Sequence, residues 1–140
     1  MTRFDASRGI KFAALVYALG LALHTADHLR RGLEVLTPEV QWAGNLSTLF
    51  GITAVALVLT NNRFGPLTAA LTGVPVALGV AAVHLLPHWS AFSDSFPDAH
   101  GTGVSALSWT VVSIEIIGAL AMGVCGLLVL REQHRSMPTR

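Results

Sequence analysis

The chain predicts an all-α fold, an integral membrane four-helix bundle with both termini in the cytoplasm. Its 140 residues are 52% hydrophobic and only 12% charged, whereas soluble domains carry about 25% charged residues. The apolar residues form four long runs, each long enough to cross a bilayer core of about 30 Å as a helix. No run alternates polar and apolar residues as a barrel strand would, so backbone hydrogen bonding in lipid requires helices.

The four runs follow one another with little sequence between them, which predicts a single domain over residues 1–140. The expected spans cover residues 10–29, 40–60, 64–86 and 103–130. The first has Lys11 at its start and a histidine and aspartate group at its end, and the second is uncharged. The third carries Pro66 in its first turn, where proline suits a helix. The fourth contains one charged residue, Glu115.

The basic residues predict the orientation. Seven of the nine fall on the side of the termini: Arg3, Arg8, Lys11, Arg63, Arg131, Arg135 and Arg140. The other two, Arg30 and Arg31, follow the first span. By the positive-inside rule the termini are cytoplasmic, in a multi-pass protein of the cell membrane. A cleavable signal peptide is the alternative interpretation of the first run, because a basic start precedes a short apolar stretch.

Histidines and acids gather where the first and third spans end. His24, Asp27 and His28 are three and four positions apart, so a helix places them on one face. His84 and His88 repeat the four-residue spacing at the end of the third span. The first and third spans run in the same direction, so we expect these side chains to meet at the external face of the membrane.

The loop after the third span adds further acidic and histidine side chains. Imidazoles and carboxylates without thiolates suit zinc, copper or iron. We therefore expect a divalent transition-metal site near the external face. The candidate ligands are His24, Asp27, His28, His84, His88, Asp94, Asp98 and His100.

Glu115 lies about twelve residues inside the fourth span. A charged side chain at the centre of a bilayer costs about 2.5–3.5 kcal/mol, so Glu115 should face the interior of the bundle. Glu115 and Asp27 are the candidate catalytic residues, since either could take a proton from a metal-activated water. An interhelical hydrogen bond is the structural alternative for Glu115. The sequence leaves open whether the protein is an enzyme.

The expected function is metal-dependent catalysis, or the binding and handling of a metal ion. Two alternatives stay open: a haem b-binding electron-transfer protein, with axial histidines from the first and third spans, and an accessory or scaffold subunit of a membrane complex. The expected partners are the lipid bilayer and a second copy or larger complex. Rows of small residues such as Ala14, Ala18 and Ala22 allow close helix contact, within one chain or between two. No basic run suggests nucleic acid.

Overall fold

The computed structural model describes residues 6–135, which form four α-helices and one short 3₁₀ helix. In chain order these are α1 (Ala6–Arg31), η1 (Leu33–Val35), α2 (Pro38–Leu59), α3 (Gly65–His84) and α4 (Ala106–Arg135). All four α-helices are long and apolar enough to cross a membrane. The prediction of an all-helical chain with four potential spans is confirmed, and each predicted span overlaps one helix.

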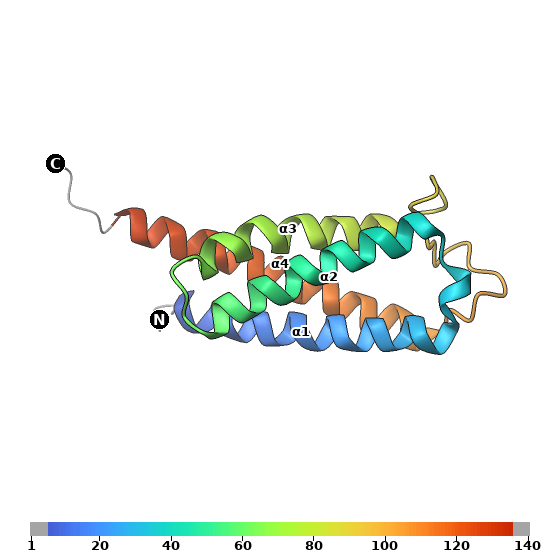
Figure 1. The fold of residues 1–140 in the computed structure, drawn as a ribbon, viewed down its shortest axis with the longest axis horizontal. Coiled ribbons are helices and arrows are strands. Elements are labelled where there is room, and N and C mark those ends of the chain that lie inside the picture. The colour runs from blue at the N-terminus through green and yellow to red at the C-terminus, as the bar shows by residue number, and fades with distance from the viewer. Residues whose placement is uncertain (1–5, 136–140) are drawn as a thin grey trace.

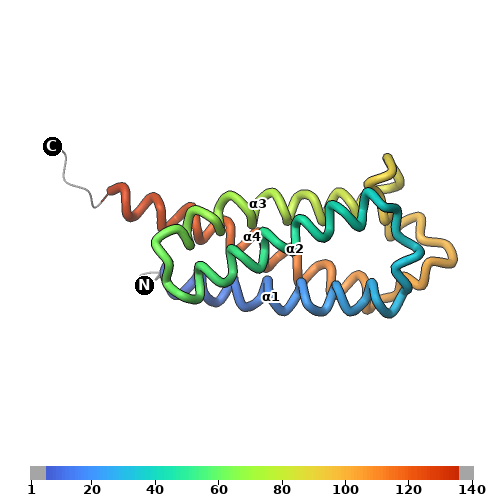
Figure 2. The backbone as a smooth tube through the Cα atoms, viewed as in Figure 1, coloured from blue at the N-terminus to red at the C-terminus, as the bar shows by residue number. Residues whose placement is uncertain are grey.

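The helices alternate in direction within one elongated bundle (Figure 1). We call the end where α1 begins and α4 ends the termini end. The opposite end, which carries η1 and residues 85–105, is the loop end. The tube view shows that α2 crosses the bundle obliquely (Figure 2). Tyr17 of α1 meets α2 at Gly51, where an added Cβ would lie 2.1 Å from the Tyr17 hydroxyl.

Helix α4 packs tightly between α1 and α3 because small residues let the backbones approach. A Cβ at Gly20 of α1 would lie 2.6 Å from Glu115 Cα, and one at Gly73 of α3 would lie 2.5 Å from the Ala119 carbonyl oxygen. These small residues therefore serve contacts within the chain. Helix α1, for which a signal peptide was the alternative interpretation, forms one wall of this packed core and is one of the four helices of the bundle.

Local sequence explains where α2 begins and how α3 is joined to it. Thr37 caps α2 by accepting a hydrogen bond from the Val40 N–H at 3.2 Å, and Pro38 follows in the first turn. The turn before α3 contains Asn61 with a φ of 56°, a left-handed conformation that asparagine tolerates.

Helix α3 ends at His84, two residues earlier than predicted. Pro87 follows shortly after, and a proline opposes helix continuation. Residues 85–105 fold back onto the helix end, where the Asp94 N–H donates to the Val83 carbonyl at 3.1 Å and the Phe96 N–H donates to the His84 carbonyl at 2.9 Å. This return brings Asp94 beside the last residue of α3.

Large apolar side chains point outward along all four helices. Phe12, Trp42, Leu71 and Ile117 are 71%, 71%, 68% and 64% exposed. Water-soluble monomers seldom expose so continuous an apolar surface, whereas a bilayer would cover it. At the loop end, in contrast, a group of polar side chains is buried: His24, Asp27, Arg31, His84 and Asp94.

Candidate metal centre

Three of the predicted ligands, His24, His28 and His84, come together inside the loop end. One ring nitrogen from each lies within 4.8 Å of one from each of the others. His24 and His28 stand one turn apart on α1, and His84 is the last residue of α3. The ring centroid of His24 lies 4.5 Å from that of His28 and 4.7 Å from that of His84. Helix geometry and the parallel course of α1 and α3 thus assemble three imidazoles at one level.

Carboxylates orient two of these imidazoles. His24 Nδ1 hydrogen-bonds to Glu115 of α4. His84 Nδ1 lies 3.2 Å from the Asp94 carbonyl oxygen and 3.3 Å from its carboxylate. A neutral imidazole that donates from Nδ1 keeps Nε2 as a free lone pair. His24 Nε2 is buried without a hydrogen-bond partner. Metal-binding histidines are commonly held by carboxylates in this way.

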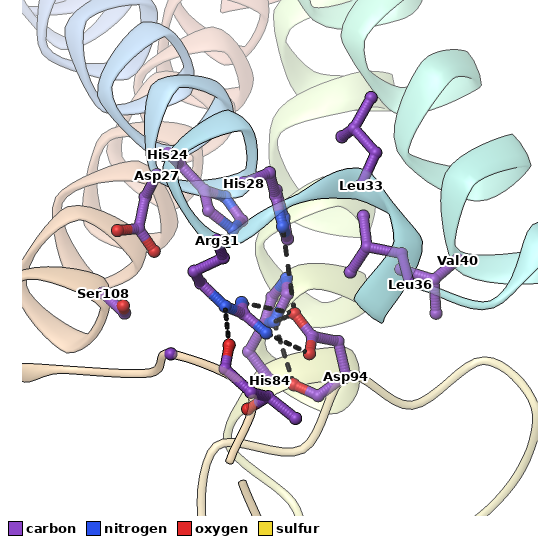
Figure 3. Close-up of polar contacts among 12 residues, drawn as sticks. His24, Asp27, His28, Arg31, Leu33, Leu36, Val40, His84, Asp94 and Ser108 are labelled. Atoms are coloured by element: carbon purple, nitrogen blue, oxygen red, sulfur yellow. Dashed lines mark hydrogen bonds and ion pairs between the residues drawn. The ribbon is translucent and has the colours of Figure 1, made fainter.

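Arg31 holds Asp94 beside the histidines (Figure 3). Its guanidinium donates to both Asp94 carboxylate oxygens, at 2.8 and 2.7 Å, and to the Thr102 carbonyl at 3.1 Å. Burial raises the pKa of Asp94, but the hydrogen bonds from His84 and Arg31 outweigh it and leave the pKa well below its ordinary value. Asp94 is therefore ionised at neutral pH. It also lies 3.9 Å from His28 Nδ1.

Asp27 faces α4 and lies apart from the three histidines. Figure 3 shows its carboxylate on the Ser108 side of α1. Arg30 donates to Asp27 at 2.9 Å, to the Gly103 carbonyl at 2.8 Å and to the Ser108 hydroxyl at 3.3 Å. Asp27 is only 2% exposed, and its Oδ2 has no hydrogen-bond partner. Asp27 thus positions Arg30, which links α1 to α4 through Ser108. The catalytic role of Asp27 stays a prediction.

The other predicted ligands lie on the exposed part of residues 85–105. Asp98 accepts hydrogen bonds from the His88 N–H at 2.6 Å and from the Ser95 hydroxyl at 2.9 Å. These hydrogen bonds lower the pKa of Asp98. Because α3 ends at His84, the expected helical pair of His84 and His88 does not form. The structure places His88, Asp98 and His100 outside the three-histidine group, and their part in metal binding stays a prediction.

A cavity of about 540 Å³ lies beside the histidines, between α1, α2 and α3. His24, His28, His84 and Glu115 form one polar part of its lining. The remaining walls are largely apolar, with Leu29, Leu33, Leu36, Val40, Val76, Val80 and Val83 among them. Pockets of this size and character bind small molecules in proteins. The three imidazoles thus line a partly open space that is large enough for a ligand.

Sequence reasoning missed the contribution of α2 to this cavity. Gln41, Asn45 and Thr48 line it from a single helix face, at spacings of four and three residues. That polar row inside an otherwise apolar run was the available signal. Phe96 was also not predicted. Its ring centroid lies 4.8 Å from that of His84, with the rings tilted by 46°, and 5.3 Å from the Arg31 guanidinium carbon. A lone phenylalanine in a loop carries no such signal.

The fold and site define a class: an all-helical chain with four potential membrane spans and a group of three histidines, two of them buried. No family model, curated protein or solved structure matches the chain. The geometry is therefore the basis for any functional conclusion.

Proposed function

We propose that the protein is a membrane metalloprotein in which His24, His28 and His84 bind one transition-metal ion. The observation that carries the proposal is the pairing of His24 with Glu115 and of His84 with Asp94. Both pairs engage Nδ1, so Nε2 is the nitrogen left for an ion. A buried histidine that served only helix packing should have both ring nitrogens satisfied, whereas His24 Nε2 is buried without a partner.

Three protein ligands favour a catalytic type of site over a closed structural one. Catalytic zinc sites commonly use three protein ligands and keep another position open. Here the open side would face the cavity, because all three histidines line it. A bound ion would supply a Lewis acid toward an oxygen-bearing group. Glu115 also lines the cavity. It accepts the hydrogen bond from His24 Nδ1, and its carboxylate could take a proton from a ligand bound in the cavity.

The packing of the rings favours a single ion over haem b. The two axial histidines of a haem stand on opposite faces of the macrocycle. In contrast, the His24 and His84 rings meet edge to face with centroids 4.7 Å apart, and His28 packs against His24 at 4.5 Å. A flat macrocycle between them would require the helices to separate, whereas one ion would require only a small inward movement of the rings.

Insertion with both termini in the cytoplasm would put the metal centre near the external face. The distribution of basic residues supports this orientation, because orientation follows the number of lysines and arginines on each side of the membrane. Among the described residues, two basic side chains, Arg30 and Arg31, belong to the loop end, and five belong to the termini end: Arg8, Lys11, Arg63, Arg131 and Arg135.

Metal analysis tests the proposal. The purified wild type is compared with His28→Ala, His84→Ala and the control His134→Ala, whose residue lies in the exposed end of α4. We expect about one zinc, copper or iron ion per wild-type chain after equilibration with that metal, with the same content in the control. Each of the other two variants should lose most of it. Full metal content in both would overturn the proposal.

A further inference from the structure

We infer that the cavity binds a single-chain lipid, with an uncharged oxygen-bearing head at the histidines and its chain along α2 and α3. The inference rests on the proposed metal centre for the position of the head. The chain-binding part rests on the cavity itself, so the two can fail separately.

The cavity follows the apolar helices instead of opening only at the loop end. Its lining runs from Leu33 and Leu36 near η1 to Phe50, Pro75 and Val76 in the middle of α2 and α3. On α2, Phe50 is 58% exposed beside it. In the proposed membrane position, these mid-helix residues lie at the depth of the acyl chains. A molecule already dissolved in the bilayer could reach the cavity there without crossing water.

The charges of the lining select the class of head group. Among the described residues that line the cavity, none is lysine or arginine, and Glu115 is the one carboxylate. A phosphate head would find no cationic partner there beyond a metal ion, and an ammonium head would meet an acid already bonded to His24. Asn45, Thr48 and the side-chain oxygen of Gln41 instead offer neutral hydrogen-bonding groups. The amide nitrogen of Gln41 already donates to backbone carbonyls. A hydroxyl, ester or amide head satisfies this combination.

Two glycines keep the apolar part of the cavity open. An added Cβ at Gly44 of α2 or Gly79 of α3 would meet no atom within 4 Å, although both residues line the cavity. Glycine weakens a helix relative to alanine, and neither glycine is needed here for close packing. A large side chain at either position would therefore fill the cavity without displacing neighbouring atoms.

The test uses a diazirine-bearing fatty alcohol as a photoreactive probe on the full-length protein in lipid nanodiscs. The wild type is compared with Gly79→Phe and with the matched control Leu78→Phe, whose residue is 65% exposed and outside the cavity lining. Mass spectrometry locates the labelled residues, and zinc content is measured on the same samples.

We expect labelling of cavity-lining residues in the wild type and in Leu78→Phe. Gly79→Phe should reduce it about tenfold or more, because losing contact with about two buried methylene groups has an effect of that size. Equal labelling in Gly79→Phe and Leu78→Phe would overturn the inference. Zinc bound normally without cavity labelling would overturn it while leaving the metal centre intact. Cavity labelling that Gly79→Phe removes, in a protein that binds no metal, would support lipid binding and refute the proposed function.

Discussion

The two neighbours of α1 differ in how closely they approach it. Helix α4 is pressed against α1 at Gly20, and this contact carries the polar links from His24 to Glu115 and from Arg30 to Ser108. Helix α2 meets α1 at Tyr17 and Gly51, and the cavity separates the two helices toward the loop end. One side of α1 is thus built for fixed geometry, and the other leaves room for a ligand.

This difference teaches how a small bundle can hold a rigid site and a cavity together. Metal ligands need rings fixed by packing and hydrogen bonds, which α4 and residues 85–105 supply. A binding cavity needs space, which the oblique α2 leaves. Substitutions on the two sides should therefore have different consequences.

The largest effect is expected from breaking the Arg31 and Asp94 pair. Arg31→Met would leave the Asp94 carboxylate buried without its main partner, and removing one member of a buried ion pair costs about 3–5 kcal/mol. The measurement is thermal or denaturant unfolding in detergent. The double variant Arg31→Met/Asp94→Asn should recover much of the loss. If the double variant lost as much unfolding free energy as Arg31→Met and Asp94→Asn lose in sum, the two side chains would contribute independently and the prediction would be wrong.

Matched glycine substitutions compare the two sides of α1 directly. Gly20→Ala places a Cβ 2.6 Å from Glu115 Cα, and such overpacking costs about 1–3 kcal/mol. Gly44→Ala meets no atom within 4 Å and should be neutral or slightly stabilising, because alanine favours helix. Unfolding of the two variants under identical conditions checks this. Equal destabilisation would show that α1 is not held more tightly by α4 than by α2.

Glu115→Gln should weaken metal binding without preventing folding. The amide keeps the size of the carboxylate but gives His24 Nδ1 a weaker acceptor. Loss of such an orienting group typically lowers metal affinity about 10–100-fold. Competition with a chelator of known affinity measures the change, beside Glu132→Gln on the exposed end of α4 as a control. An unchanged affinity would reduce Glu115 to an interhelical contact.

The smallest effect is expected in the exposed loop. Asp98→Asn and His100→Ala change residues on the surface of residues 85–105, outside the three-histidine group. Both should keep wild-type metal content and affinity in the same competition assay. A clear loss in either would mean that the loop folds over the site when the ion binds.

The sequence predicted the helices well because each is encoded locally. Long apolar runs, the Thr37 and Pro38 start of α2 and the proline after α3 are local signals for where helices lie. It also predicted the three histidines, since a four-residue spacing and parallel helix ends place them on one face at one level. It did not predict that Asp94 lies beside the histidines while Asp98 stays on the surface. That difference arises because the backbone after α3 folds back to hydrogen-bond with Val83 and His84.

By itself, then, the sequence determined the all-helical class, the potential spans and the cluster of histidines at one end of the bundle. Periodicity and hydropathy suffice for these, since they depend on residues close together in the chain. The tertiary structure decided which carboxylate serves which imidazole, that Asp27 turns toward α4, and that α2 leaves a cavity beside the site. These features depend on how closely each helix pair can approach, and that distance is set by glycines brought together from distant segments.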